Sequence, residues 1–182
     1  MITGYKRILL IGFRGAGKST LGALLAQNLN WQYVSTDLIL EQRHQKKIAE
    51  MVKESGWKSF REAEHSIIQD IEDRYNVVID CGGGVIERED NMDLLKTDSL
   101  IIWVDAKLED LRKRISKNLD ERPHLTRSNL QLDIKENYQR RKPLYHKYAH
   151  MKVDSSENSP QELCQKILNR YRSKEEFSNG DE

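Results

Sequence analysis

A glycine-rich segment near the start of the chain limits the possible folds more than any other feature of the sequence. Residues 12–20 read Gly-Phe-Arg-Gly-Ala-Gly-Lys-Ser-Thr and match the pattern G-x-x-x-x-G-K-[ST] in full. The preceding residues, Arg7–Ile11, form a short apolar run rich in Ile and Leu, which predicts a buried strand. Residues 18–28 carry leucines at helical spacing, which predicts a helix. A strand, a glycine turn and a helix in this order are typical of a phosphate-binding loop.

The residue types in this loop fit the binding of nucleotide phosphates. Glycines let the backbone turn tightly, so that its N–H groups point at phosphate oxygens, and the following helix adds the positive end of its dipole. Lys18 is expected to reach the β- and γ-phosphates, and the Ser19 hydroxyl is expected to ligate Mg²⁺. The ATP contacts expected within the loop are Gly12, Gly15, Ala16, Gly17, Lys18, Ser19 and Thr20.

The loop alone does not distinguish a kinase from a GTPase or an ATPase. A GTPase would read guanine with an Asn-Lys-x-Asp motif, and the sequence contains none. A chain of 182 residues is also too short for an ATPase that drives large mechanical motion. A kinase that acts on a small molecule is the remaining hypothesis.

Composition argues against several other classes of protein. Lys and Arg total 30 and Asp and Glu total 29, so the net charge of +1 gives no support for a nucleic-acid-binding surface. The longest apolar run is far shorter than the about 20 residues of a membrane span, and no cleavage site of a secretory signal follows the first residues. The cysteines, Cys81 and Cys164, lack metal-ligand spacing. We therefore expect a cytoplasmic protein without nucleic-acid or membrane partners, and a monomer by default.

The rest of the chain alternates strands with helices. Further strands are expected at residues 33–34, 76–81, 99–104 and 151–154. Helices are expected at residues 37–44, 48–55, 58–75, 108–117, 133–148 and 160–172, with a break at Gly56 and a kink near Pro143. This alternation predicts a parallel sheet covered on both faces, which binds ligands at the carboxyl ends of its strands. We expect a single domain over residues 1–172 and a disordered tail at 173–182.

Together with the phosphate loop, several segments resemble the shikimate kinase family, and the resemblance runs from Arg7 to about Ile167. The triple glycine and the Arg-x-Pro-Leu-Tyr segment are more specific together than either is alone. The segments that carry the resemblance are the loop at 12–20, Thr36-Asp37 with Glu-Gln-Arg at 41–43, Phe-Arg-Glu-Ala-Glu at 60–64, Gly-Gly-Gly at 82–84, Arg122-Pro123 and Arg-Lys-Pro-Leu-Tyr at 141–145.

The resemblance implies a three-layer αβα P-loop kinase fold, like that of the nucleoside monophosphate kinases, with a five-stranded parallel sheet in the order 2-3-1-4-5. It implies that ATP donates its γ-phosphoryl group to the 3-hydroxyl of shikimate, in aromatic amino-acid (chorismate) biosynthesis. Two arginines suit the shikimate carboxylate, and Asp37 can accept hydrogen bonds from ring hydroxyls and orient the attacking oxygen. By resemblance the shikimate contacts are Asp37, Arg61, Gly82, Gly83, Gly84 and Arg141, and the catalytic residues are Lys18 and Asp37.

The arginine assignments have plainer alternatives. Arg61 and Glu64 are three residues apart, which also fits an ion pair on a helix surface. Arg140, Arg141 and Lys142 also fit a solvated basic face. The presence of the phosphate loop and the triple glycine in the same chain favours the functional role for Arg61 and Arg141.

Residues 118–132 are polar and resemble the family's lid, which closes over the nucleotide. Arg122 matches the lid arginine that lies over ATP. A second arginine of the family contacts the adenine side. The candidates for that role are Arg112, Lys113 and Arg114.

The sequence departs from the family pattern at Ser35. The family usually has an Asp at this position, which helps hold Mg²⁺ through water, whereas a hydroxyl is an uncharged and weaker partner. The third strand ends in Asp80, where phosphate-loop proteins often place a metal-directed Asp and where many family members have a small uncharged residue. The hypothesis is that the carboxylate has moved to Asp80, so that Ser19 and Asp80 serve the metal. The alternative is that Asp80 caps its loop by accepting backbone N–H bonds.

Two other functions remain open on the sequence alone. One is a related small-molecule kinase acting on another hydroxylated acid such as gluconate, against which the two arginines and the triple glycine favour shikimate. The other is a non-catalytic binding module of the same family. The presence of Lys18, Asp37 and Arg141 argues against that module.

Overall fold

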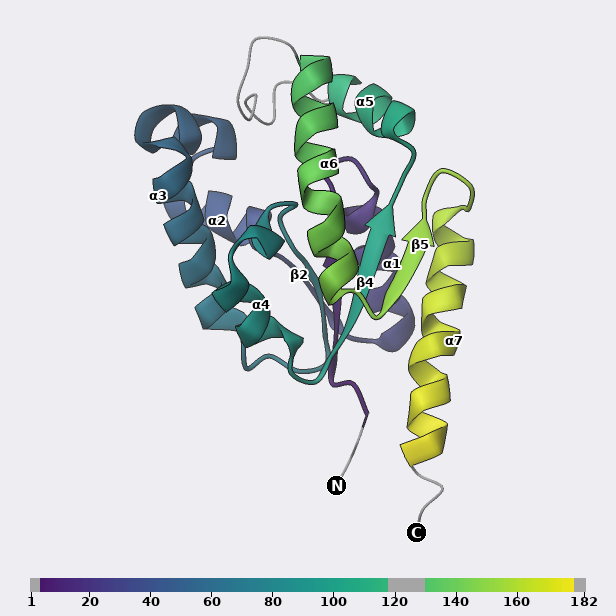
Figure 1. The fold of residues 1–182 in the computed structure, drawn as a ribbon. Helices are drawn as coiled ribbons and strands as arrows, with labels where there is room; N and C mark the ends of the chain where they lie inside the picture. The colour runs from purple at the N-terminus through teal and green to yellow at the C-terminus, as the bar shows by residue number, and fades with distance from the viewer. Residues whose placement is uncertain (1–3, 118–129, 179–182) are drawn as a thin grey trace.

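The computed structural model describes residues 4–117 and 130–178 of the chain. A five-stranded sheet, in which every strand pair is parallel, has the order β2-β3-β1-β4-β5 (Figure 1), which confirms the expected order. The strands are β1 (Arg7–Ile11), β2 (Gln32–Ser35), β3 (Val77–Asp80), β4 (Ser99–Asp105) and β5 (Met151–Asp154). The helices are α1 (Lys18–Leu29), α2 (Thr36–His44), α3 (Ile48–Ile71), α4 (Glu89–Lys96), α5 (Leu108–Lys117), α6 (Leu130–Tyr148) and α7 (Pro160–Ser178), with a short 3₁₀ turn η1 (Val85–Glu87).

Helices cover both faces of the sheet. α1 packs on β3 and against α7, while α4 and α6 contact β4 from the other side (Figure 1). Every residue of β1, β3 and β4 is buried, as expected for central parallel strands that are covered on both faces. No helix in the described ranges combines the length and the apolar character that crossing a bilayer requires.

A second, smaller hydrophobic cluster holds α2 and α3 together beside the main core. These two helices carry Asp37 and Arg61, so the cluster fixes part of the site. Its buried members are Leu40, Ile48, Met51, Val52, Phe60 and Ile67.

Helix boundaries follow the sequence in most places. Gly56 has non-helical dihedral angles (φ 75°, ψ 169°) inside α3, which confirms the predicted break. α3 ends at Ile71 rather than at residue 75, and α6 continues through Pro143. The sequence did not predict the 3₁₀ turn η1 or the eight-residue helix α4, because both are too short to show a clear apolar period.

The carboxyl-terminal helix is longer than the sequence predicted. The expected tail begins at residue 173, whereas α7 continues to Ser178. The added residues include Lys and Glu, which favour helix by their own propensity without any apolar pattern. Residues 179–182 lie outside the described ranges.

Arg7 lies at the amino end of β1, on the edge of the sheet opposite the phosphate loop. Its side chain is buried, and burial lowers the pKa of its guanidinium from the usual value. Its hydrogen bonds to described residues all go to uncharged oxygens, among them carbonyls at the carboxyl ends of α3 and α4. The acceptors are the Ser99 hydroxyl and the carbonyls of Glu72, Leu94, Leu95 and Thr97.

Candidate active site

The phosphate loop connects the end of β1 to the start of α1. Gly12, Gly15 and Gly17 have positive φ angles of 145°, 79° and 91°. A Cβ on Gly12 would lie 2.1 Å from the carbonyl oxygen of Val104, so glycine is required there. The loop therefore has the backbone geometry that its glycine spacing predicted.

The loop opens into a cleft of about 620 Å³ at the carboxyl end of the sheet. The cleft contains most of the predicted ATP contacts, while Gly12 and Ala16 are buried behind it. The Lys18 ammonium donates to the Phe13 carbonyl at 3.3 Å, so the side chain lies across the loop. The lining includes Gly15, Gly17, Lys18, Ser19 and Thr20 of the loop, Tyr33, Ser35, Asp37 and Asp80 near the ends of β2 and β3, and Arg114 of α5.

The three candidates for the second nucleotide arginine differ in their position relative to the cleft. Arg114 lines the cleft and donates to the Gly15 carbonyl at 3.1 Å and to the Ser155 carbonyl at 3.0 Å. Arg112 donates instead to the Gln131 carbonyl at 3.4 Å. The other expected nucleotide arginine, Arg122, lies outside the described residues, as does the lid from 118 to 129. The last three residues assigned to the lid begin α6.

A second and much smaller cavity, of about 30 Å³, lies next to the cleft. The lining of both cavities includes Arg14, Asp37 and Ile48, so the two are adjacent. All the residues expected to contact shikimate line the small cavity. Its full lining is Arg14, Asp37, Ile48, Trp57, Phe60, Arg61, Glu64, Gly82, Gly83, Gly84 and Arg141.

Arg61 and Glu64 form the ion pair that their spacing allows, but the pair is not a surface one. The guanidinium lies 2.7 Å from Glu64 Oε2, and Glu64 is 1% exposed. Burial raises the pKa of the Glu64 carboxyl, although the Arg61 guanidinium opposes that rise. The second oxygen, Oε1, is buried without a hydrogen-bond partner among the described residues.

The triple glycine lets these side chains approach the backbone closely. A Cβ on Gly82 would lie 2.8 Å from both Asp37 Oδ1 and Glu64 Oε1, so these two acceptor oxygens face the same point. A Cβ on Gly84 would lie 2.0 Å from the Arg61 guanidinium. The loop thus brings acceptors and a cationic donor to one small space.

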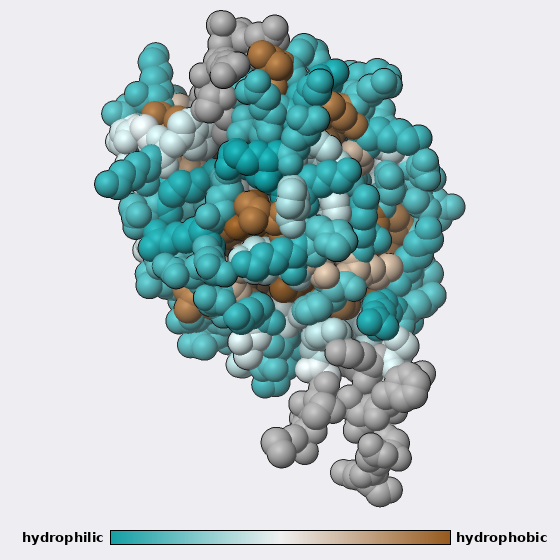
Figure 2. Space-filling view, in the orientation of Figure 1, coloured by the Kyte–Doolittle hydropathy of each residue, from teal (hydrophilic) through white to brown (hydrophobic). Residues whose placement is uncertain are grey.

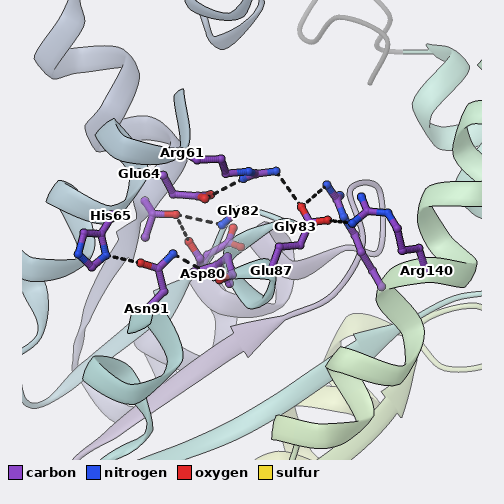
Figure 3. A network of polar contacts seen from close by, with 12 residues as sticks. Arg61, Glu64, His65, Asp80, Gly82, Gly83, Glu87, Asn91 and Arg140 are labelled. Carbon is purple, nitrogen blue, oxygen red and sulfur yellow. Dashed lines mark hydrogen bonds and ion pairs between the residues drawn. The ribbon is translucent and has the colours of Figure 1, made fainter. Parts of the chain in front are cut away.

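Arg141 is buried, which excludes the solvated basic face as its explanation. It is 4% exposed, its guanidinium lies over the Phe13 ring at 5.7 Å, and it donates to Glu87 at 2.9 Å. Its Nε is buried without a partner among the described residues. The adjacent Arg140 has a 57% exposed side chain and fits a surface role better. Figure 3 shows Glu87 between Arg61 and Arg140.

Asp80 lies beside the phosphate loop and does not cap the loop that follows β3. Its Oδ2 accepts hydrogen bonds from the Ser19 hydroxyl at 2.7 Å and the Tyr33 hydroxyl at 2.9 Å. The N–H of Gly82 in the following loop donates instead to the Thr36 hydroxyl oxygen at 3.0 Å. Both donors that the described residues supply to the carboxylate are hydroxyl groups, so Asp80 does not accept from the backbone of the loop that follows it.

Tyr33 and Ser35 complete the surroundings of this carboxylate. Burial and the Asp80 carboxylate raise the pKa of Tyr33, so the phenol stays protonated and donates its hydrogen bond. The Ser35 hydroxyl accepts from the Leu38 N–H at 3.4 Å and caps α2. Within the described ranges, no three His, Cys, Asp or Glu side chains gather as a metal cluster. A cation at Ser19 and Asp80 therefore needs further oxygens from a nucleotide.

Comparison with known proteins assigns the chain to a family. The sequence model of the family described as shikimate kinase matches residues 14–172. The chain belongs to the shikimate kinase family. The shikimate kinase of Thermodesulfovibrio yellowstonii is 37% identical over 175 residues, which cover 96% of this chain and 98% of that one. The shikimate kinase of Dehalococcoides mccartyi (strain BAV1) is 36% identical over 173 residues, with 94% and 96% coverage.

Solved shikimate kinases share the fold along nearly the whole chain. The shikimate kinase of Acinetobacter baumannii in complex with shikimate aligns with a TM-score of 0.87 and 27% identity, covering 95% of this chain and 96% of that one. The enzyme of Aquifex aeolicus aligns with a TM-score of 0.78 and 32% identity, with 92% and 97% coverage. These alignments confirm the P-loop kinase fold that the sequence predicted.

The sequence interpretation as a shikimate kinase missed several residues of the site. Glu64 lies on the same helical face as Ile67, Ile68 and Ile71, so the apolar period of α3 already indicated a buried carboxylate. Tyr33 and Glu87 had no such signal, because their partners are 47 and 54 residues away along the chain.

Proposed function

We propose that this chain is an ATP-dependent shikimate kinase, which transfers the γ-phosphoryl group of ATP to the 3-hydroxyl of shikimate. The observation that carries the proposal is the pair of adjacent cavities with Asp37 in the lining of both. One cavity has the phosphate loop, and the lining of the other includes Arg61, Arg141 and two acceptor oxygens. A nucleotide and a hydroxylated carboxylic acid therefore have separate sites that meet at one carboxylate.

In the nucleotide cleft, the loop N–H groups and Lys18 bind the phosphates. Lys18 neutralises charge that develops on the transferring group, because its ammonium lies within the loop. Arg114, fixed by Gly15 and Ser155, supports the nucleotide from the α5 side. Arg122 is proposed to lie over ATP from the lid, as the family resemblance implies.

Ser19 and Asp80 are the residues that would hold Mg²⁺. The fit rests on donor chemistry: a hydroxyl and a carboxylate lie 2.7 Å apart beside the phosphate loop, and hard cations prefer oxygen ligands. When bound, the ion neutralises phosphate charge in the transition state. The Tyr33 hydroxyl holds the Asp80 carboxylate in position at 2.9 Å.

In the small cavity, Arg61 and Arg141 bind the carboxylate of shikimate through charge-assisted hydrogen bonds. Asp37 Oδ1 and Glu64 Oε1 face one point and accept hydrogen bonds from ring hydroxyls. Asp37 orients the 3-hydroxyl toward the γ-phosphorus. The bond from that oxygen to phosphorus forms as the bond to the bridging oxygen of ADP breaks, and the hydroxyl proton leaves toward Asp37.

A coupled assay of ADP release tests this function, with shikimate, quinate and gluconate as parallel acceptors. We expect kcat/KM for shikimate to exceed those for the other two by about 100-fold or more, because the site matches the ring hydroxyls of one acceptor. Lys18→Ala serves as the control for contaminating kinases. Faster release with gluconate would indicate the related kinase, and shikimate binding without release would indicate a non-catalytic module.

We also propose that the protein is a cytoplasmic monomer. Cys81 and Cys164 are both free thiols, as is typical of a protein in a reducing compartment. Light scattering after size exclusion is expected to give a mass near 21.3 kDa, with or without ATP. A mass near twice that value would contradict the monomer.

A further inference from the structure

Glu87 is a carboxylate that the chain itself places between the proposed acceptor arginines. It lies in η1, directly after the triple glycine, and its side chain is 18% exposed. Its Oε2 accepts from Arg141 Nη2 at 2.9 Å and from Arg61 Nη2 at 3.2 Å, while Oε1 accepts from Arg140. Figure 3 shows Glu87 between Arg61 and Arg140. One oxygen therefore bridges the two inner guanidiniums and the other faces an outer one.

These guanidiniums are the groups assigned above to the carboxylate of the acceptor. A carboxylate on a ligand and the carboxylate of Glu87 have the same charge and shape, so they compete for the same N–H donors. The competition is reinforced by electrostatics: although burial alone raises the pKa of Glu87, Arg141, Arg61 and Arg140 together lower it, which keeps this carboxyl ionised.

The two inner arginines are held in place without Glu87. Arg61 is paired with the buried Glu64 at 2.7 Å and lies over the Phe60 ring at 5.2 Å. Arg141 is 4% exposed and lies over the Phe13 ring. Removal of the Glu87 charge therefore leaves both guanidiniums positioned for a ligand.

The space beside these arginines is too small for the acceptor as it stands. A volume of about 30 Å³ is close to that of one water molecule, so a ring that enters the cavity displaces surrounding side chains or extends into the adjoining cleft. Glu87 does not line the cavity itself but binds two arginines that do. Glu87 has a direction in which to move, because the Arg140 side chain is 57% exposed and already binds its outer oxygen. The Arg140 pair can persist while the inner pairs are exchanged.

We propose that Glu87 is an affinity-setting residue, whose carboxylate is exchanged for the carboxylate of the acceptor at Arg61 and Arg141. The proposal rests on the assignment of the acceptor carboxylate to these two arginines. Exchange weakens the binding of shikimate, since each new ion pair replaces an existing one. It also speeds the release of the phosphorylated product, which retains the same carboxylate.

Calorimetric titration of shikimate into the purified full chain tests the proposal, with wild type, Glu87→Gln and Glu62→Gln compared at low salt. Glu62 is the matched control, because it is an exposed carboxylate paired with Arg88. We expect Glu87→Gln to lower the Kd for shikimate about fivefold, because a competing ion pair is lost. The Kd for ADP should stay unchanged in both variants, since Glu87 does not line the nucleotide cleft.

A double-mutant cycle with Arg140→Gln separates exchange from a supporting role. Without Arg140, Glu87 loses its outer partner and stays on the inner arginines, so the Kd for shikimate should rise in this variant. That rise should disappear in the Glu87→Gln background, because Arg140 acts through Glu87. Thermal melting of each variant checks that it is folded.

The outcomes separate this proposal from the proposed function. Absence of shikimate binding to the wild type would overturn the function itself. Wild-type binding with an equal or higher Kd in Glu87→Gln would overturn the exchange and make Glu87 a support for the arginines. An Arg140→Gln effect that persists in the double variant would overturn the outward movement of Glu87.

Discussion

Arg7 and Arg141 are buried arginines at opposite edges of one sheet, and they have different partners. Arg7 is 2% exposed, and every hydrogen bond recorded for it goes to an uncharged oxygen. Arg141 is 4% exposed, donates to the carboxylate of Glu87, and has a buried Nε without a partner in the described part of the chain. Similar burial therefore serves two different purposes.

The difference shows how a binding site can be recognised from unmet hydrogen bonds. Carbonyls at the ends of α3 and α4 take up the donors of Arg7, and a cation there also complements the helix dipoles. At the carboxyl edge, donors and acceptors remain incompletely matched, and Glu64 Oε1 is a second case. Such groups cost folding free energy unless a ligand binds them, so two of them beside one cavity favour a ligand site there.

The largest effect is expected at the phosphate loop, where we propose that phosphoryl transfer takes place. We expect Lys18→Ala to lower kcat by at least about 1000-fold, because a donor to developing charge is removed. The midpoint of thermal unfolding should change little, since the hydrogen bond from Lys18 to the Phe13 carbonyl is long, at 3.3 Å. Steady-state kinetics and melting curves measure the two effects, and turnover within tenfold of the wild type would contradict the assignment.

At the amino edge the expected effect is on stability alone. Arg7→Met should lower the free energy of unfolding by about 3 kcal/mol, because several buried carbonyls lose their donor. Urea denaturation measures this change. The KM values for ATP and shikimate should stay at wild-type levels at temperatures where the variant is folded. A raised KM would contradict the assignment of Arg7 to stability alone.

The same substitution at the carboxyl edge should give the opposite pattern. Arg141→Met is expected to raise the KM for shikimate about 50-fold, because a buried charge-assisted contact is lost. Arg61→Ala should act in the same direction. The two effects should be non-additive, because both arginines serve one carboxylate. A change in the KM for ATP alone would show that these arginines do not bind the acceptor.

The parts of the molecule that follow local patterns were predictable from the sequence. The spacing of Gly12, Gly15 and Gly17 fixes the loop, and alternating apolar runs predict the strands. The sheet order and the shikimate contacts came from the family resemblance, and the structure places those contacts around one cavity. Their roles in catalysis and binding remain predictions.

The parts that depend on distant contacts were not predictable. Glu87 meets Arg61 across 26 residues and Arg141 across 54, and no period in the sequence relates them. α4 buries Asn91 along with two apolar side chains, so its buried face shows no clear apolar pattern in the sequence. The polar end of α7 was missed for a different reason. Its residues favour a helix by their intrinsic propensity, although no apolar pattern predicts one there.

The smallest expected effect concerns Asp80, and it tests whether an unusual charge at the carboxyl edge serves the metal. Asp80→Asn should raise the Mg²⁺ concentration needed for half-maximal activity about tenfold, because a carboxylate beside Ser19 attracts the cation and an amide does not. Raising Mg²⁺ should restore much of the activity. Titration of ADP at fixed Mg²⁺ should show the same shift without turnover.

Asp105 provides the matched control for this experiment. It ends β4, is 5% exposed like Asp80, and accepts a hydrogen bond from the Tyr138 hydroxyl at 3.0 Å, but it does not line the cleft. Asp105→Asn should therefore alter stability without altering the Mg²⁺ dependence. Introducing Ser35→Asp into Asp80→Asn should recover part of the loss, because it returns a negative charge to the end of the neighbouring strand β2, whose Ser35 pairs with Asp80 in the sheet. An unchanged Mg²⁺ dependence in Asp80→Asn would show that the carboxylate only positions Ser19 and Tyr33. Asp80 would then not replace the Asp that the family usually has at the position of Ser35.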